Sequence, residues 1–280
     1  MAEPDSLERH NVKLTPTQTT LLVTLHARVL DAARPNPVIN DKWAAEVLGQ
    51  IENPPSNLSQ SRRIDIVPLR GQQLDEWATE FLAKHAEATV LHLACGLDSR
   101  HHRLKWNAPG TKVRWIDVDF PDVVDLRKKL YEAPDGDYRL LAANVTDEEW
   151  LPQIPTDRPT VVIFEGLTPY LTEETGPALI RRLVDHFKHG ELLFDTVGPI
   201  SIRMQSLFSA VGKVGATFTW GVKGPEVIEQ LHPSLKLRNC HRPSDIKGFD
   251  SLLSSTRWIY STYRHLPAVR NLHLTNRFEF

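Results

Sequence analysis

Short apolar segments alternate with amphipathic stretches from residue 89 onward. Five of these segments are rich in β-branched residues and predict strands at 89–94, 112–118, 138–145, 160–166 and 191–197. The stretches between them predict helices at 100–106, 121–130, 147–151 and 173–189. This alternation predicts a parallel sheet with crossover helices on both of its faces. The strands are apolar almost throughout, as expected for strands that are covered on both sides.

The segments on either side of this block have different patterns. Residues 17–34 and 71–86 carry apolar side chains at helical spacing, and a shorter helical stretch covers 41–50. Residues 198–224 contain several glycines and a mixed apolar content, which indicates an insertion or lid over the site. Two further strands are expected near 235–240 and 272–280, which brings the total to seven.

The predicted fold class is α/β, with a Rossmann-like, seven-stranded, mostly parallel sheet and helices on both faces. A length of 280 residues and a hydrophobic share of 41% fit one such domain. We expect a single domain over 1–280, divided into an N-terminal helical cap (15–86), a cofactor-binding core (89–197), the inserted lid (198–224) and the C-terminal strands (225–280).

The charge and composition of the chain indicate which classes of partner to expect. Lys and Arg number 33 against 35 Asp and Glu, so there is no global positive field, and we expect no nucleic-acid partner. The N-terminus lacks the apolar core of a secretion signal, and no apolar run approaches the length of a spanning helix. Cys95 and Cys240 are far apart in sequence and form no metal-ligand pair. We therefore expect a cytoplasmic protein with no metal site and no membrane contact.

The stretch HLACGLDSR (92–100) removes side-chain bulk where the first core strand ends. Small residues at Ala94, Cys95 and Gly96 allow the backbone to approach a ligand, and the helix that follows adds partial positive charge. A merely structural turn is an equal alternative on the loop alone. Cys95 is interpreted as a small buried residue and not as a nucleophile, because no adjacent cation is evident.

Polar side chains also follow the next core strands. Asp117 and Asp119 lie about 20 residues past the loop, where nucleoside-binding folds place an acid against the ribose hydroxyls. One of them is expected to contact ribose and the other to cap the helix that begins at Pro121. The alternative is that both are capping or solvated acids.

Further polar groups end the third and fourth core strands. Asn144 and Val145 place an amide beside an apolar surface, which suits adenine, although Asn144 on its own is more typical of a turn. Glu165 and Gly166 place a carboxylate at the floor of the predicted site. Arg70, one helix before the strand block, is expected either to fold over the crevice and pair with a carboxylate or to be a surface residue.

Taken together, these residues resemble the class I S-adenosylmethionine-dependent methyltransferases of the leucine carboxyl methyltransferase family, and most closely the tetracenomycin-type polyketide O-methyltransferases. The resemblance covers most of the chain. Its motifs are LRGQQLDEW (69–77), VLHLACGLDSRHHRL (90–104), VRWIDVDFPDVVDLRKKL (113–130), LAANVTDEEW (141–150) and VIFEGLTPYL (162–171).

The resemblance implies a role for each candidate residue. Arg70 would hold the methionine carboxylate of the cofactor, and the loop from Ala94 through Cys95 and Gly96 to Asp98 would be the cofactor turn. Asp119 would bind ribose, with Asp117 as the nearest substitute; Asn144 and Val145 would flank adenine. Glu165 and Gly166 would lie near the methionyl end, and Tyr170 near the acceptor.

Two positions depart from the pattern of the family that the chain resembles. Ala94 stands where the family often has glycine, which is tolerable if its φ is negative. Asn144 replaces an acid, but its oxygen can still accept a hydrogen bond from the adenine amino group.

The expected function is S-adenosyl-L-methionine-dependent O-methylation of a small-molecule acceptor, with S-adenosyl-L-homocysteine as the product. A carboxylate of a polyketide-like or aromatic acid is favoured, because it is already ionised at pH 7 and needs no base. The alternatives are methylation of a protein C-terminal carboxylate and a cofactor-binding scaffold without transfer activity. His101 and His102 are interpreted mainly as packing or solvated residues. Met204, Phe208, Phe218 and Trp220 indicate either an apolar acceptor pocket or a packed core.

Overall fold

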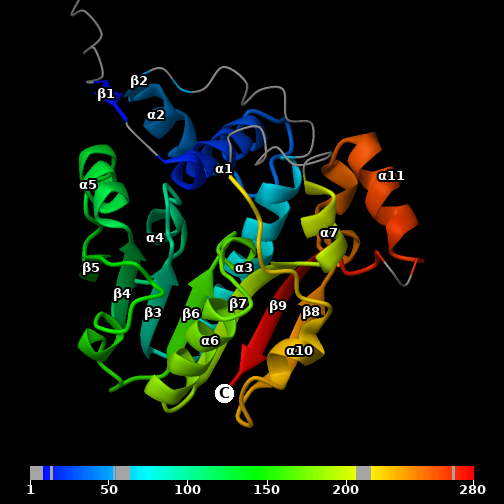
Figure 1. Cartoon of the computed structure of the whole chain (residues 1–280). Helices are drawn as coiled ribbons and strands as arrows, with labels where there is room; N and C mark the ends of the chain where they lie inside the picture. Colours follow the sequence, from blue (N-terminus) through cyan, green and yellow to red (C-terminus); the bar gives the residue numbers. More distant parts are fainter. Residues whose placement is uncertain (1–8, 13–14, 53, 55–63, 206–215, 267–268) are drawn as a thin grey trace, which may run out of the picture.

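The computed structural model describes residues 9–12, 15–52, 54, 64–205, 216–266 and 269–280. Its centre is a seven-stranded sheet in the order β5-β4-β3-β6-β7-β9-β8 (Figure 1). The strands are β3 (Glu87–Leu93), β4 (Lys112–Asp119), β5 (Asp137–Ala142), β6 (Thr160–Phe164), β7 (Gly190–Val197), β8 (Lys236–His241) and β9 (His273–Glu279). Strands β3, β4, β5, β6 and β7 all run parallel to one another. Strand β9 lies between β7 and β8 and is antiparallel to both. The predicted fold class and all seven predicted strands are confirmed.

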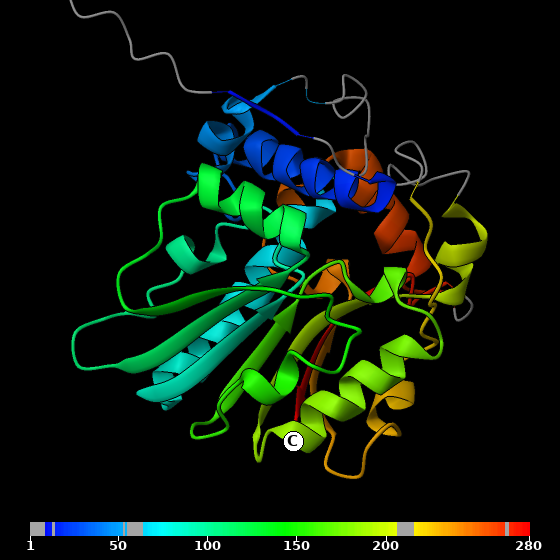
Figure 2. The ribbon, with the colours of Figure 1, turned by 60° about the vertical axis from the view of Figure 1, so that its left-hand side comes forward.

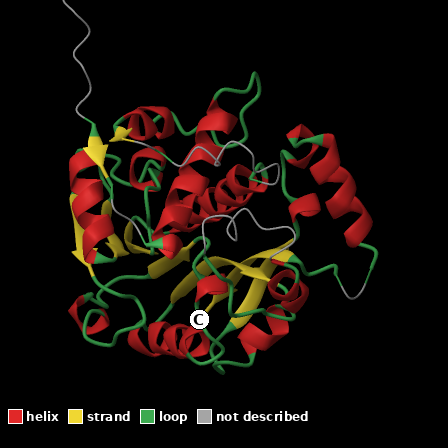
Figure 3. Ribbon diagram, turned by 45° about the horizontal axis from the view of Figure 1, so that its top comes forward, coloured by secondary structure: helices red, strands yellow, loops and turns green. Residues whose placement is uncertain are grey.

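Helices cover both faces of the sheet (Figures 2 and 3). On one face, α3 (Ile66–Lys84) packs Leu74, Trp77 and Phe81 against β3, β4, β6 and β7. On the other face, α6 (Thr175–His186) packs Leu179, Ile180 and Leu183 against the alternate residues of the same strands. Because both faces are buried, the central strands have the near-continuous apolar character that the sequence shows.

The N-terminal cap lies over the carboxyl ends of the parallel strands, at the top of Figure 1. It consists of α1 (Pro16–Ala32) and α2 (Ala44–Gly49), which pack with α5 (Pro121–Leu130) in one apolar cluster. A capping box starts α1, because the Thr15 hydroxyl accepts from Gln18 N while the Gln18 side chain accepts from Thr15 N. The short strands β1 (His10–Asn11) and β2 (Ile51–Glu52) pair beside it.

Several predicted boundaries are wrong. Helix α4 covers only Arg100–Arg103, and the helix expected at 147–151 is a turn followed by the 3₁₀ helix η2 (Leu151–Gln153). The segment read as a lid contains α7 (Pro199–Arg203) and an extended stretch from 216 to 224 that leads into α10 (Pro225–Glu229). Phe208 lies outside the described residues. Helix α11 (Ser254–Tyr263) was not expected.

The connections that the structure describes include the 3₁₀ turns η2, η3 (Thr168–Tyr170), η4 (Pro243–Asp245) and η5 (Phe249–Ser251). Within the described part of the chain, no helix is long and apolar enough to cross a membrane.

Candidate functional site

A cavity of about 800 Å³ lies at the carboxyl ends of the parallel strands and is lined by residues of α1 in the N-terminal cap. Eleven of the twelve candidate residues line it: Arg70, Ala94, Cys95, Gly96, Asp98, Asp119, Asn144, Val145, Glu165, Gly166 and Tyr170. The twelfth, Asp117, does not. Parallel strands bring their carboxyl ends to one edge of the sheet, which explains why residues from the motifs at the ends of β3, β4, β5 and β6 meet. Arg70 joins them from α3.

The loop after β3 has an unusual backbone. Ala94 has a φ of 48° and Gly96 a φ of 50°, so both occupy the left-handed region. The expectation that Ala94 would have a negative φ is therefore wrong. This conformation is natural for Gly96 but costs a residue with a Cβ about 1–2 kcal/mol. Several hydrogen bonds fix the loop, among them those from Gly96 N to Asp119 Oδ2 (2.6 Å), from Cys95 N to Val118 O (3.3 Å) and from Arg127 Nη1 to Gly96 O (2.8 Å).

The two acids of β4 differ in their surroundings. Asp119 faces the cavity, and its carboxylate also accepts from Phe120 N at 2.8 Å. Burial raises the pKa of Asp119, and the amides of Gly96 and Phe120 oppose that rise. Neither acid caps α5, whose first turn has no side-chain cap, so the expectation of a capping aspartate is wrong.

Asp117 is fully buried beneath the loop. Its carboxylate accepts from Arg127 Nη2 (2.6 Å), Trp115 Nε1 (2.7 Å) and the Tyr138 hydroxyl (2.9 Å), and it lies 3.2 Å from His92 Nδ1. Burial favours the neutral acid, but the Arg127 charge and the His92 contact lower the pKa of Asp117 below its usual value. With its carboxylate occupied and no face on the cavity, Asp117 does not fit the ribose role that was left open for it.

Arg70 joins two strand ends. Its Nη1 donates to Asp195 Oδ2 at 2.6 Å, while Nε and Nη2 donate to Glu165 Oε1 at 3.2 and 3.1 Å. Asp195 also accepts from Gly166 N at 2.6 Å. Gly166 has a φ of 70°, and a Cβ there would lie 3.4 Å from Arg70 Nη2. The surface alternative for Arg70 is therefore wrong, and glycine is needed where the chain passes the guanidinium.

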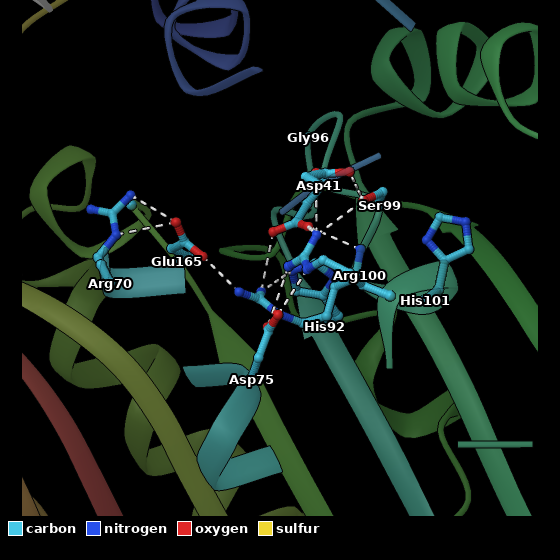
Figure 4. A network of polar contacts seen from close by, with 12 residues as sticks. Asp41, Arg70, Asp75, His92, Gly96, Ser99, Arg100, His101 and Glu165 are labelled. Carbon is cyan, nitrogen blue, oxygen red and sulfur yellow. Dashed lines mark hydrogen bonds and ion pairs between the residues drawn. The ribbon is translucent and has the colours of Figure 1, made fainter. Parts of the chain in front are cut away.

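A larger charged network surrounds Glu165 (Figure 4). Arg70 lies on one side of Glu165 and Arg100 on the other, with Arg100 Nη2 at 2.6 Å from Glu165 Oε2. Asp75 accepts from Arg100 Nε at 2.6 Å. Burial favours protonation of Glu165, but the charges of Arg70, Arg100 and the nearby Arg28 lower its pKa to about 2. Glu165 is therefore ionised at neutral pH.

Arg28 and Asp195 are two charged cavity residues that were not predicted from the sequence. Arg28 comes from α1, is 4% exposed, and donates to Asp98 Oδ2 at 2.9 Å; its Nε is buried without a hydrogen-bond partner. Burial would raise the pKa of Asp98, but the charges of Arg100, Arg28 and Arg103 bring it well below its usual value. Among the residues that the structure describes, the arginines of this network are Arg28, Arg70, Arg100 and Arg103, and its acids are Asp41, Asp75, Asp98, Glu165 and Asp195. It carries one more acid than base.

Asn144 forms a turn as well as lining the cavity. Its side-chain oxygen accepts from Thr146 N at 3.1 Å and from the Thr146 hydroxyl at 2.9 Å, and its amide nitrogen donates to Asp147. Both lone pairs of the oxygen are used, so the expected contact with an adenine amino group would require this turn to open. Val145 is buried beside it and presents an apolar surface to the cavity.

The other half of the cavity is mostly apolar. Tyr170 lies there with its ring 5.2 Å from that of Phe218, and its hydroxyl bonds Thr20. Helix α11, the segment that follows it and the start of β9 complete this wall with Ile259, Tyr260, Tyr263, Leu266, Leu272 and His273. Met204 and Phe218 line it too, whereas Trp220 packs in the core against Gly176.

His101 and His102 do not line the cavity. His101 is buried against Tyr138, 5.2 Å between ring centroids, and burial lowers its pKa to about 3. His102 stacks on Trp43 at 5.4 Å. The packing interpretation of both is confirmed. Burial raises the pKa of the Cys95 thiol, which agrees with an inert residue. No group of three or more potential metal ligands occurs among the residues that the structure describes.

Comparisons with known proteins identify the family and several relatives of this chain. The family model for leucine carboxyl methyltransferase matches residues 21–184, more than half of the chain. The tetracenomycin polyketide synthesis O-methyltransferase TcmP of Streptomyces glaucescens is 41% identical over 96% of this chain and 98% of its own. The S-adenosyl-L-methionine-dependent methyltransferase dpfgK of Gibberella zeae is 40% identical over 83% of this chain and 84% of its own. Leucine carboxyl methyltransferase 1 of Caenorhabditis elegans is 26% identical over only 52% of this chain and 54% of its own.

Solved structures support the fold independently. A protein from Thermobifida fusca superposes with a TM-score of 0.61 at 15% identity, covering 94% of both chains. With its fold, its cavity and these sequence relationships, the chain belongs to the leucine carboxyl methyltransferase family of S-adenosyl-L-methionine-dependent methyltransferases.

Proposed function

We propose that this enzyme transfers a methyl group from S-adenosyl-L-methionine to a carboxylate oxygen of a small, aromatic, polyketide-like acid. The observation that carries the proposal is the composition of one continuous cavity, which is charged at the strand ends and apolar beneath α11. The charged half suits a cofactor that has a zwitterionic end. The apolar half suits an acceptor with a planar hydrocarbon framework. The relative that matches nearly the whole chain is a polyketide O-methyltransferase by name.

The charged half suits the cofactor by its donors and acceptors. Arg28 and Arg70 offer N–H groups to the methionine carboxylate, and the unpartnered Arg28 Nε is one of them. Glu165 and Asp195 offer oxygens to the ammonium group, and Asp119 to the ribose hydroxyls. The small residues from Ala94 to Gly96 let the backbone approach, and Val145 offers an apolar wall to adenine.

The net charge of the network is opposite to that of the cofactor. It has one more acid than base, while S-adenosyl-L-methionine carries a sulfonium, an ammonium and a carboxylate, and so one net positive charge. A buried charge is expensive unless it is compensated. Binding of the cofactor would therefore neutralise the network.

The bound cofactor supplies a methyl group on a positively charged sulfur. The protein's contribution is to align the acceptor oxygen and to exclude water, because an ionised carboxylate needs no base. Tyr170 is the candidate for the first task. Burial raises its pKa to about 12, so its neutral hydroxyl can donate a hydrogen bond in the apolar half of the cavity.

Transfer of a labelled methyl group to a panel of aromatic acids tests the proposal. We expect methyl esters, which mild base hydrolyses. Products that resist base would be ethers and would contradict the carboxylate assignment. A peptide with a C-terminal leucine belongs in the same panel, because the family model derives its name from that substrate. The similarity to the leucine carboxyl methyltransferase of Caenorhabditis elegans covers only about half of this chain, which favours the small acid.

A cofactor-binding scaffold without transfer activity is the remaining alternative. Its support is confined to Ala94 and Asn144, the two positions that depart from the usual family pattern. Calorimetry with S-adenosyl-L-homocysteine separates the cases: cofactor binding without transfer to any member of the panel would favour the scaffold.

A further inference from the structure

His273 is one of two histidines that line the cavity among the described residues. It begins β9 and pairs across the sheet with Val197, two residues beyond Asp195 on β7. The consecutive residues His273, Leu274 and Thr275, at the start of β9, all line the cavity. His92 also lines it, but that ring lies against Asp117 and Arg100.

Within the described part of the chain, the ring nitrogens of His273 have no hydrogen-bond partner. The ring lies 6.0 Å from that of Tyr260 of α11, measured between centroids, at an interplanar angle of 69°. His273 is half-buried and lines the cavity, so water can reach the ring when no ligand is bound. A ligand in the cavity would replace that water as the partner of the imidazole.

The charge state of His273 decides what it can do. Burial lowers its pKa to about 4, and the positive charge of Arg70 lowers it in the same direction. The imidazole is therefore neutral at pH 7, with one N–H donor and one acceptor nitrogen. A phenol has a pKa near 10, so a group that holds its proton so weakly is a poor base for it. A hydrogen-bond donor is the better assignment.

We propose that His273 determines acceptor specificity by donating a hydrogen bond from its imidazole to the carboxylate that receives the methyl group. The inference rests on the proposed function and extends it to the acceptor side of the cavity. As the carboxylate oxygen forms its bond to the methyl carbon, the carbon–sulfur bond breaks and its electron pair stays on sulfur. No proton moves, and His273 keeps its N–H. Tyr170 lines the same region and is the second donor available to the carboxylate.

Two probes of nearly equal shape test the inference: 2-naphthoate, which carries the carboxylate, and 2-naphthol, which does not. Their affinities are measured by calorimetry on protein saturated with S-adenosyl-L-homocysteine. In His273→Phe we expect the affinity for 2-naphthoate to fall by at least about ten-fold, the range for a hydrogen bond to a charged group. The affinity for 2-naphthol should change by less than about two-fold, because the apolar contacts are kept.

Two further variants exclude a structural explanation. His273→Gln keeps an N–H donor and is expected to restore most of the preference for the acid. His265→Gln changes an exposed histidine of the same region and should have no effect. Equal losses for both probes in His273→Phe, or a wild-type protein that does not prefer 2-naphthoate, would overturn the inference.

The cofactor titration keeps this test separate from that of the proposed function. If the protein binds S-adenosyl-L-homocysteine but His273→Phe does not weaken the binding of 2-naphthoate, only the inference is contradicted. Wild-type protein that fails to bind S-adenosyl-L-homocysteine contradicts the proposed function and the inference together.

Discussion

Asp195 Oδ2 lies 2.6 Å from Arg70 Nη1, and this contact joins the end of β7 to the helix α3. Asp195 also accepts from Gly166 N, so one carboxylate fixes the guanidinium and the turn after β6 together. Burial raises the pKa of Asp195, and Arg70 is the main influence that opposes the rise. Asp195 is thus a positioning residue for the charged half of the cavity.

Asp195→Asn is expected to weaken the binding of S-adenosyl-L-homocysteine by about 1.5–3 kcal/mol, because Arg70 loses a charged partner. Calorimetry measures this, with Asp185→Asn as the control, since Asp185 is an exposed acid on α6. Unchanged affinity in Asp195→Asn would show that Glu165 alone suffices to hold Arg70.

Ala94→Gly should stabilise the protein. Ala94 has a φ of 48°, which costs a residue with a Cβ about 1–2 kcal/mol, whereas glycine adopts it readily. The greater entropy of glycine in the unfolded chain offsets part of the gain, so we expect about 0.5–1 kcal/mol in urea unfolding. Ala108→Gly in an exposed loop, where φ is not positive, should be neutral or slightly destabilising. Equal effects of the two changes would argue against strain at Ala94.

The two aspartates of β4 are expected to separate stability from binding. Asp117→Ala leaves the Arg127 charge buried and unpaired, which typically costs about 3–5 kcal/mol of folding free energy. Asp119→Ala should instead weaken cofactor binding with a smaller loss of stability, since Asp119 faces the cavity. Urea unfolding and calorimetry on both variants distinguish them. The reverse pattern would return the ribose role to Asp117.

The sequence predicted the sheet and most of the cavity because both follow from local patterns. Apolar runs identify strands, and polar residues directly after them gather at one edge of a parallel sheet. Arg28 was missed, although it lies on the same face of α1 as Leu21 and Leu25, where a charge among buried leucines was the available signal. Asp195 had a signal too, as a polar residue late in an apolar strand.

Other features depend on tertiary contacts that no local pattern encodes. Asp117 and Asp119 are two residues apart on one strand, and only the position of Arg127 on α5 decides which of them is occupied. The positive φ of Ala94 is imposed by the turn, against the preference of the residue. Helix α11 has a polar sequence, SSTRWIYSTY, and its place on the cavity wall is set by packing.

Stability should fall as the pH is lowered from about 6.5 towards 3. His101 has a folded-state pKa of about 3 against 6.5 in the unfolded chain, so between these values the unfolded state binds the additional proton. Glu165, with a folded pKa of about 2 against 4.5, contributes in the same direction below pH 4.5. Each proton contributes up to about 1.4 kcal/mol per pH unit. Urea unfolding from pH 7 to 4 measures the slope, and His101→Gln should make it shallower; an unchanged slope would mean that His101 protonates in the folded state.

Binding of a carboxylate acceptor should depend on the charge at the cofactor's sulfur position. The cavity already contains Glu165 and Asp195, which repel an anion, and a positive centre beside them offsets that repulsion. At an effective dielectric constant near 20, two unit charges 4 Å apart interact by about 4 kcal/mol, so even a fraction of this changes affinity by about ten-fold.

We expect 2-naphthoate to bind at least about ten-fold more tightly to protein loaded with sinefungin, whose amine is positively charged, than to protein loaded with S-adenosyl-L-homocysteine, whose sulfur is neutral. The uncharged 2-naphthol should show no such preference, and calorimetry with both cofactor analogues measures the four affinities. If 2-naphthol gains as much as 2-naphthoate, the analogues differ in the shape they give the cavity and not in charge, and the carboxylate assignment loses its electrostatic support.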